Sequence, residues 1–484
     1  MMNNRFLPLR LLDEKQIHKI HETSVKILED IGINVESKVA REIFGENSCK
    51  IVGSRVYIPE HIIQDLAFIP QGKTTLYSRT GKTVDVEKGN ILVHNVGAVA
   101  NIIDLENGSQ RAATLDDAAN LVRLMDALEN IHAITPIVYP QEIEQDVALL
   151  YAVREIIKNT TKPICGPGVS SIIEAQYIHE MFVALAGDEQ TLREKPMYDI
   201  GFSPLSPLTF PKGDTDTAIW GVKRGIPIGA LPCPIAGMTA PITFLGSLTQ
   251  QNAEILAVLV LVRLIDPSVP ITYSARLSYA DMRYGNTVGG SPEAAITGAC
   301  AVQLADFYGL DSNVYGAGSS AILGDAQMGF EKALNTIFPA IVGSNWLSGA
   351  GLVADGASIS YEQLVLDNEF FGGIFQLLGS IKDDEEDYGY EVIKDIMDNN
   401  NDFVTHENTM KYLRSKEVWS RINYIGNSRV YTAWVQDGKR SIIDNAKEKA
   451  DYIIKMHQVE PLDLAVEKEL DKIISAARKD LIKA

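Results

Sequence analysis

The feature that most constrains how this chain can fold is an alternation of short β-rich runs with longer amphipathic helical patterns. The β-rich runs number eight, which is the number of strands that a closed parallel barrel requires. Amphipathic helices between strands flanked by glycine and proline favour such a barrel over a doubly wound sheet. The candidate strands are Ile91–Asn95, Ala133–Tyr139, Pro163–Gly166, Tyr198–Ser203, Ile226–Cys233, Ile271–Arg276, Asn313–Gly316 and Ala340–Trp346. The sequence therefore predicts an α/β fold, a (β/α)8 TIM-type barrel.

The regions on either side of the predicted barrel differ from it in character. Residues 1–85 mix short helices and strands, and we interpret them as an N-terminal, mainly helical cap on a barrel at residues 86–350. Residues 351–484 begin in a glycine-rich loop and continue in helical patterns. We interpret them as a C-terminal helical extension that packs on the barrel and is a candidate for self-association, so we expect a homo-oligomer.

Charge and cysteine content exclude several classes of protein. The formal net charge of −19 over 484 residues argues against nucleic acid or an anionic membrane surface as a partner. The longest apolar run, Ile255 to Val262, stops at Arg263, so we expect no membrane span. The N-terminus shows no signal peptide and the cysteines form no CxxC pair, which is typical of a cytoplasmic protein without a protein-bound metal. The absence of a GxGxxG or Walker loop predicts no nucleotide site.

The seventh predicted strand ends in a run of small residues. The strand, from Ser312 to Tyr315, is followed by Gly316, Ala317, Gly318 and Ser319. A barrel carries its chemistry where the strands end, and small side chains there leave room for a large molecule to approach. The alternative interpretation is a tight turn that needs the φ freedom of glycine.

The same stretch resembles a known family. FYGL at residues 307–310, the strand end VxG and the helix start D-x-Q-x-G-x-E-K from Asp325 are similar to the trimethylamine methyltransferase family, whose members depend on a corrinoid. The motifs Ser206-Pro207-Leu208, Asn252-Ala253-Glu254, Gly290-Ser291-Pro292-Glu293 and Glu362-Gln363-Leu364-Val365 extend the similarity over most of the chain.

This resemblance implies a reaction and a partner. The methyl acceptor would be Co(I) of a corrinoid (cobalamin) that a separate, cognate corrinoid protein carries. In the founding members the residue after the strand's glycine is pyrrolysine, whereas this chain has Ala317 at that position. The chain therefore resembles the pyrrolysine-free branch, whose known members demethylate quaternary amines such as betaines. A neutral amine would leave directly, so no catalytic acid or base is assigned.

Aromatic residues near the predicted strand ends are candidates for holding a quaternary ammonium, because such a contact is worth about 0.5–2 kcal/mol. Trp346 ends the eighth predicted strand, and Tyr315 has the same side-chain parity as Ala317. Phe202, at the end of the fourth strand, and Tyr279, in the loop after the sixth, are weaker candidates. Packing in the core is the alternative for each.

Arg276 is the most informative charged residue. In the run ITYSAR, the apolar residues alternate with Thr272, Ser274 and Arg276, which predicts that these three face the barrel interior. An inward arginine requires a partner, and a betaine carboxylate is a natural bidentate one. The alternative is a structural ion pair with a nearby acid such as Asp281.

Three further polar residues complete the predicted substrate site. His94 and Asn95 end the first predicted strand and can offer hydrogen bonds. Asp355, in the glycine-rich loop after the barrel, can balance the charge of a cation or cap a helix.

These observations lead to one prediction of function and two alternatives. The prediction is a methyltransferase that moves a methyl group from a quaternary amine (glycine betaine, proline betaine, carnitine, butyrobetaine or choline) to Co(I) of a cognate corrinoid protein. A barrel lyase or aldolase needs a Schiff-base lysine or a metal-binding set, and no lysine lies at a C-terminal strand end. The other alternative is a non-catalytic relative that binds the corrinoid protein or a ligand without turnover.

Overall fold

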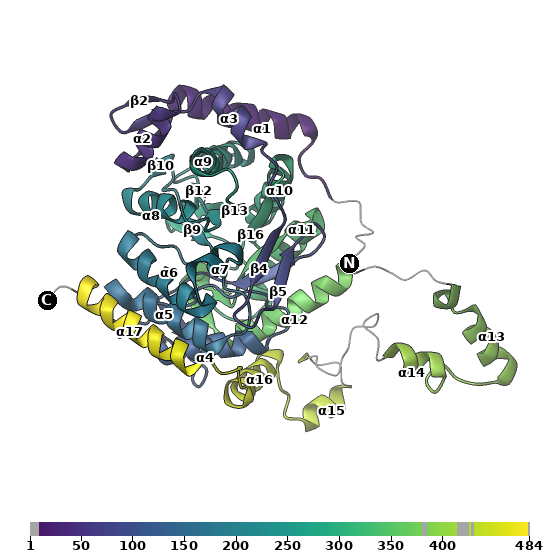
Figure 1. The fold of residues 1–484 in the computed structure, drawn as a ribbon. Coiled ribbons are helices and arrows are strands. Elements are labelled where there is room, and N and C mark those ends of the chain that lie inside the picture. Colours follow the sequence, from purple (N-terminus) through teal and green to yellow (C-terminus); the bar gives the residue numbers. More distant parts are fainter. Residues whose placement is uncertain (1–8, 380–384, 414–424, 427–429, 483–484) are drawn as a thin grey trace.

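The core of the molecule is a ring of parallel strands surrounded by helices (Figure 1). The computed structural model describes residues 9–379, 385–413, 425–426 and 430–482. Six strands form one parallel sheet in the order β6-β17-β16-β13-β11-β9. Their bounds are Leu92–Asn95 for β6, Ile200–Phe202 for β9, Ile228–Ala230 for β11, Ile271–Ala275 for β13, Asp311–Tyr315 for β16 and Trp346–Ala350 for β17.

Two short segments close this sheet into a barrel. Parallel bridges join His94 to Ala133, Ile134 to Ile164, and Gly168 to Gly201. The segments around residues 133–134 and 164–168 thus occupy the positions between β6 and β9, although each forms only isolated bridges. The predicted (β/α)8 TIM-type barrel is therefore the fold of the chain.

The eighth predicted strand was wrong in position. The run at residues 340–342 belongs to helix α11 (Ala326–Val342), and the strand begins only at Trp346. The apolar residues 340–342 suggested the start of a strand, but Ala340 and Val342 are buried at the end of this helix. Gly343, with φ of 100°, ends the helix in a left-handed cap. Trp346 consequently starts its strand.

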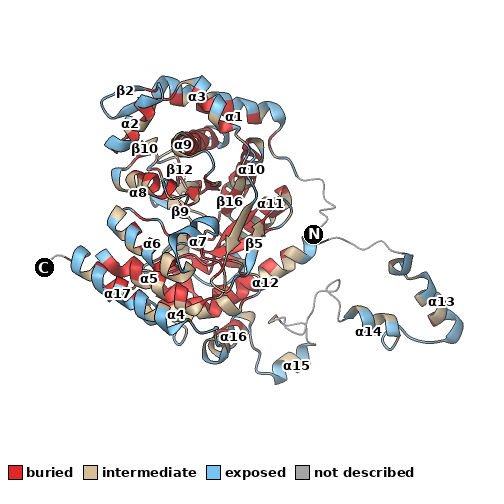
Figure 2. Cartoon of the chain, in the orientation of Figure 1, coloured by how far each residue is buried: buried red, intermediate tan, exposed pale blue. Residues whose placement is uncertain are grey.

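Helices cover the outside of the barrel, with their buried faces turned toward the strands and their exposed faces outward (Figure 2). They are α4 (Leu115–Ala127), α5 (Gln145–Asn159), α6 (Ile172–Ala186), α7 (Glu189–Glu194), α8 (Lys212–Val222), α9 (Phe244–Ile265), α10 (Pro292–Tyr308), α11 and α12 (Tyr361–Leu378). Among the described residues, α9 alone is long and apolar enough to cross a membrane by length and composition, but 89% of its apolar window is buried inside the protein. Its composition is thus explained by packing in the core.

The segment before the barrel contributes to both the outer layer and the barrel interior. Helices α1 (Glu14–Lys26), α2 (Lys38–Glu46) and α3 (Glu60–Ala67) accompany a sheet of β1 (Ile33–Val35), β2 (Lys50–Val52), β3 (Arg55–Tyr57) and β10 (Thr209–Phe210). A hairpin of β4 (Thr74–Tyr77) and β5 (Thr83–Val86) lies at the N-terminal ends of the barrel strands. There Thr74 donates a hydrogen bond of 2.6 Å to Asp311, and the Ile271 amide donates one of 2.7 Å to Gln71.

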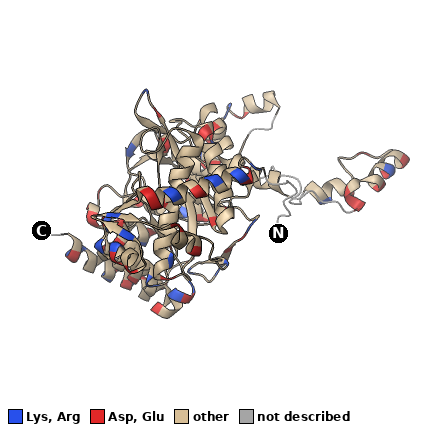
Figure 3. Ribbon diagram, turned by 90° about the horizontal axis from the view of Figure 1, so that it is seen from above, with Lys and Arg blue, Asp and Glu red and all other residues tan. Residues whose placement is uncertain are grey.

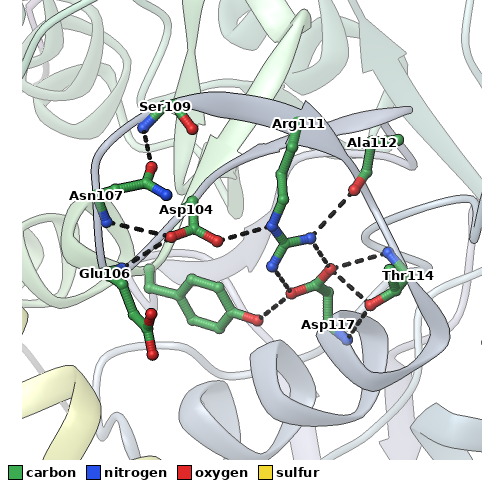
Figure 4. A network of polar contacts seen from close by, with 9 residues as sticks. Asp104, Glu106, Asn107, Ser109, Arg111, Ala112, Thr114 and Asp117 are labelled. Atoms are coloured by element: carbon green, nitrogen blue, oxygen red, sulfur yellow. Dashed lines mark hydrogen bonds and ion pairs between the residues drawn. The ribbon is translucent and has the colours of Figure 1, made fainter.

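Two small sheets follow the C-terminal ends of the barrel strands. One consists of β12 (Ile235–Ala236), β14 (Ser278–Asp281) and β15 (Asn286–Val288). The other consists of β18 (Leu352–Val353), β19 (Ser358–Ser360), β7 (Asn101–Ile103) and β8 (Gln110–Ala112). Figure 4 shows how Arg111 fastens the second sheet: its guanidinium contacts Asp104 at 2.7 Å and the buried Asp117 of α4 at 2.6 Å. Tyr361, at the start of α12, donates to the same Asp117 at 2.9 Å.

The C-terminal part continues from α12 in further helices. Two of them, α16 (Ile442–Met456) and α17 (Leu464–Leu481), pack on the barrel, α16 against α12 and α4, and α17 against α5 and α6. Helices α13 (Tyr390–Asn399), α14 (Glu407–Leu413) and α15 (Tyr431–Gln436) lie farther out, and α13 and α14 project away from the body (Figure 1). Seen from above, described acidic and basic residues are interspersed along the helices (Figure 3).

Candidate functional site

A cavity of about 420 Å³ occupies the barrel interior. It is lined by inward-facing residues of the strands and, at their N-terminal ends, by residues 73–77 and Val86 of the β4–β5 hairpin. Much of the space exists because Gly201 on β9 and Gly229 on β11 stand side by side at inward positions. A volume of this size is in the range of small-molecule sites in proteins.

Strand register brings three of the predicted site residues together in one layer of the barrel. Ala275 pairs with Val314, so Arg276 and Tyr315 follow side by side, and Tyr315 pairs with Ser348. Thr272, Ser274 and Arg276 all line the cavity, as the alternation in this strand predicted. His94 of β6 also lines it. The layer therefore combines a cation, a phenol ring, a hydroxyl and an imidazole.

Arg276 is buried, and its contacts are with neutral groups. The guanidinium donates to the Asn313 carbonyl at 2.6 Å, to Asn313 Oδ1 at 2.8 Å and to the Ala275 carbonyl at 3.0 Å. It also lies 5.1 Å from the centre of the Tyr315 ring. Desolvation lowers the pKa of this group, and no ion pair forms between Arg276 and any described carboxylate. The predicted alternative, a pair with Asp281, is wrong, because Asp281 pairs with Arg283 at 2.7 Å.

Asn313 connects Arg276 to His94 and was missed by the sequence analysis. Its side-chain amide lies 3.1 Å from His94 Nε2, and the other ring nitrogen lies 2.8 Å from the Asn95 carbonyl. Burial, followed by the nearby Arg276 charge, lowers the pKa of His94 to about 4, so the ring is neutral at pH 7. Asn313 stands two residues before Tyr315, so the two side chains point to the same face of the strand. This alternation could have identified Asn313 from the sequence.

Trp346 lines the cavity, but it lies at the start of its strand and not at the predicted C-terminal end. It is paired with Asn313 and Leu92, one layer closer to the N-terminal ends of the strands than Tyr315. Its ring is buried with Leu92, Val86 and Ala133, and its centre lies 5.8 Å from that of His94. The role of Trp346 against a cation stays a prediction.

Four predicted residues do not line the cavity. Phe202 is fully buried and packs edge-on against Phe210 at 4.9 Å, because Gly201 takes the inward position of β9. Tyr279 lies in β14 beside Phe244. Asn95 links its strand to the next by bonding both the carbonyl and the amide of Thr135 at 2.9 Å. Asp355 accepts from the Gly289 amide at 2.7 Å and from Ser320 at 2.8 Å.

The small residues after β16 are small because other chain segments approach them closely. An added Cβ at Gly316 would lie 2.4 Å from Leu347, and one at Gly318 would lie 2.6 Å from the Gly289 carbonyl. Neither glycine has a positive φ, so the predicted need for φ freedom is not the reason. Ala317 and Ser319 are also buried, at 1% and 0% exposure. In this structure none of the four offers surface to a large partner.

Other small residues do lie open beside the cavity. Gly97 and Gly168 are exposed, line the cavity and have nothing within 4 Å of an added Cβ. The exposed Cys233, after β11, lines the same edge. These residues leave open surface at this edge of the cavity, which the buried run 316–319 does not.

Asp199 also lines the cavity, and the sequence analysis missed it. It stands two residues before Gly201. The Gly166 amide donates to its Oδ1. Burial raises the pKa of this carboxyl to about 6. Its spacing of two residues from the inward Gly201 was the signal available in the sequence.

No cluster of metal ligands accompanies these residues. Among residues 9–379, 385–413, 425–426 and 430–482, no group of three or more His, Cys, Asp or Glu side chains could hold a metal ion.

The fold and cavity define an α/β-barrel protein with a polar, small-molecule-sized interior, and comparison with known proteins identifies its family. The family described as trimethylamine methyltransferase (MTTB) matches residues 1–482. The chain therefore belongs to the trimethylamine methyltransferase family and is a methyltransferase.

Individual relatives cover nearly the whole chain. A trimethylamine methyltransferase MttB of Desulfitobacterium hafniense is 29% identical over 465 residues, which are 95% of this chain and 92% of the relative. A glycine betaine methyltransferase of the same species is 28% identical over 473 residues, 97% of this chain and 98% of the relative. The crystal structure of a hydroxylamine MtmB complex is similar with a TM-score of 0.52 and 15% identity, covering 97% of this chain and 89% of that one. That likeness shows a shared fold.

Proposed function

We propose that this methyltransferase moves a methyl group from a betaine-type quaternary amine to Co(I) of a corrinoid on a separate, cognate protein. The observation that carries the proposal is Arg276, a buried cation that lines the cavity and has only neutral partners. A guanidinium in that position can bind a carboxylate in bidentate fashion. A glycine betaine methyltransferase among the relatives supports the same substrate class.

The neighbouring residues would hold and orient such a substrate. Asn313 fixes the guanidinium through two hydrogen bonds, so its free edge is preorganised for a carboxylate. The rings of Tyr315 and Trp346 offer π faces for the quaternary nitrogen. His94 is neutral at pH 7, so it adds no positive charge that would repel the ammonium group.

The reaction asks little acid–base chemistry of this chain. The corrinoid, when its protein is docked, supplies the nucleophile that accepts the methyl group. The departing amine is neutral once the carbon–nitrogen bond has broken, so the leaving group needs no proton in that step. The chain's task is to desolvate the cation, orient one methyl group outward and keep the edge at Gly97 and Gly168 free.

A binding contrast tests this proposal without the corrinoid partner. Calorimetry on the wild-type chain is expected to show binding of glycine betaine, and Arg276→Ala is expected to weaken it by about tenfold to a hundredfold, the cost of a charged hydrogen-bonded pair. Choline, which has the cation but no carboxylate, is expected to be affected much less. Equal losses for both ligands would contradict the role of Arg276.

Turnover distinguishes an enzyme of this specificity from a ligand-binding relative. Incubation with reduced cob(I)alamin and a panel of glycine betaine, proline betaine, carnitine, butyrobetaine and choline is expected to give the methylcobalamin spectrum with at least one member. No spectrum with any of them, despite binding, would contradict the proposed reaction. We also propose that the protein is located in the cytoplasm and forms a homo-oligomer.

A further inference from the structure

The cavity continues below the layer of Arg276, toward the N-terminal ends of the strands. We call this part the lower compartment, and define it by Asp199, Gly201, Gly229, Thr272 and Ser274, which all line the cavity. Register places Gly201, Gly229 and Thr272 side by side on three neighbouring strands. A short betaine held at Arg276 leaves this compartment unused.

Two glycines make the space in the lower compartment. An added Cβ at Gly201 would meet only a methyl group of Leu231, at 3.8 Å, which is ordinary van der Waals contact. Neither Gly201 nor Gly229 has a positive φ, so the backbone conformation does not require glycine at either position. A side chain could therefore stand at Gly201, and its absence keeps volume open inside the barrel.

An incompletely satisfied carboxylate faces that volume. Asp199 Oδ1 accepts from the Gly166 amide, whereas Oδ2 accepts no hydrogen bond from any other described residue. Oδ2 lies 3.8 Å from the position of a Cβ at Gly229. No described cationic side chain offsets the burial of this group. The side chain is half-buried and Oδ2 is not enclosed by the protein, so a donor group of a ligand in the cavity can reach this oxygen.

Asp199 and Arg276, two of the charged residues that line the cavity, stand at different levels of it. The same Cβ position at Gly229 is 3.4 Å from Ser274 Oγ, so Asp199 and Ser274 border one region. Ser274 precedes Arg276 by two residues, a rise of about 7 Å along a strand. The Asp199 carboxylate and the Arg276 guanidinium are thus separated by roughly 10–15 Å, which a ligand with a side chain of about four carbons spans when it hydrogen-bonds at each end.

We propose that the lower compartment is a second binding subsite, which takes an amine or hydroxyl at the end of a side chain carried by the betaine. This inference rests on the proposed function, because it assumes a betaine headgroup at Arg276. The terminal group donates to Asp199 Oδ2, and the aliphatic chain occupies the space beside Gly201 and Gly229. An apolar tail of the same length fills the space but leaves the carboxylate without a donor.

Three probes with one headgroup separate these contributions. They are glycine betaine, the N-trimethyl betaine of norleucine and the Nα-trimethyl betaine of lysine, which differ in having no tail, an apolar tail and an amine-terminated tail. Calorimetry on the full chain, without corrinoid partner, is expected to show lysine betaine binding about tenfold more tightly than norleucine betaine, as a charged hydrogen bond gives.

Variants assign the preference to the subsite. Asp199→Asn, which can still accept from the Gly166 amide, is expected to bring the affinity ratio of the two tailed probes close to one. Gly201→Val is expected to weaken both of them at least tenfold relative to wild type by filling the compartment. Asp311→Asn is the matched control: this half-buried carboxylate accepts from Thr74 and does not line the cavity, so the tenfold ratio should persist. Gly329→Val, in open space on α11, controls for the glycine change.

The outcomes separate this inference from the proposed function. If glycine betaine binds and lysine betaine is no tighter than norleucine betaine, the subsite is refuted while the proposed function stands. A ratio that survives in Asp199→Asn refutes the role of that carboxylate. If none of the three betaines binds to the wild-type chain, the proposed function itself fails, and the subsite with it.

Discussion

Lys332 and Arg276 are two of the cations buried in the described part of this chain, and their surroundings are opposite in kind. Lys332, on α11, is 1% exposed and forms an ion pair of 2.9 Å with Asp367 of α12, which is also 1% exposed. The same ammonium donates to the Ala317 carbonyl at 3.0 Å. Arg276 is nearly as buried, yet it contacts carbonyl and amide oxygens and faces a cavity.

The difference separates a structural charge from one that is free to bind. Asp367 also accepts from the Gly351 amide at 2.7 Å and from Gln363 at 2.7 Å, so the lysine pair ties the ends of β16 and β17 to two helices. The Lys332 ammonium therefore donates to a carbonyl and a carboxylate of the protein itself. Arg276 has no carboxylate of its own, so a ligand can provide one.

The largest expected contrast is in stability. Lys332→Met leaves Asp367 buried without its counter-charge, which costs about 3–5 kcal/mol of the free energy of unfolding. Arg276→Met leaves only neutral acceptors behind and should cost clearly less. Urea denaturation midpoints of the two variants measure this, and the double variant Lys332→Met/Asp367→Leu should recover much of the loss. An equal shift for both single variants would contradict the distinction.

A smaller effect is expected from the group that positions Arg276. Asn313→Ala removes the bond to the guanidinium and the contact with His94, so the arginine is less well ordered for a carboxylate. Loss of about 1–1.5 kcal/mol, or roughly tenfold in the affinity for glycine betaine, is expected. Choline is the comparison ligand. An equal loss of choline affinity would show that Asn313 acts on the cavity as a whole and not on the position of Arg276.

A third substitution examines the aromatic face. Trp346→Phe keeps an aromatic ring in the cluster of Leu92, Val86 and Ala133 but presents a weaker π surface to a cation. Affinity for both glycine betaine and choline is expected to fall about twofold to fivefold, since the effect concerns the shared ammonium group. Unchanged affinities for both would place the Trp346 ring outside the ammonium site.

The smallest effects are expected with pH. The pKa of His94 is lowered to about 4, so its ring stays neutral from pH 8 to pH 5 and should not alter glycine betaine binding. Asp199, beside Cys165 and the Gly166 amide, has a pKa raised to about 6. Its negative charge is therefore present above pH 6 and lost below it, so lysine betaine should weaken a few-fold between pH 7 and pH 5. Calorimetry at both pH values measures the contrast between the two probes.

Sequence patterns predicted the barrel because its strands are apolar, short and bounded by glycine or proline. They predicted Arg276 at the cavity because Ile271, Tyr273 and Ala275 alternate with polar residues, and the structure retains that alternation. The same reasoning failed where the inward residue is glycine. In β9, Gly201 carries no side chain to reveal its face, and Phe202 was placed on the wrong side.

Other parts of the site depended on information that local patterns do not contain. The apolar residues 340–342 suit either a strand or the buried end of a helix. Tertiary packing and the cap at Gly343 favour the helix. The small residues from Gly316 to Ser319 looked like an open mouth, but their closeness to Leu347 and Gly289 follows from contacts between distant segments. Asn313 and Asp199 could have been predicted, because each lies two residues from another inward-facing residue of its strand.

The pairing of β6 with β17 has a consequence for how the molecule is made. Trp346 lies beside Leu92, so the first and last barrel strands come from positions about 250 residues apart in the chain. On a ribosome, one edge of β6 stays unpaired until α11 and β17 have emerged, and pairings of such high contact order form slowly. A chain that stops before residue 346 would have two unpaired strand edges, and unpaired edges are templates for aggregation. The barrel can therefore close only after nearly all of its residues have been synthesised.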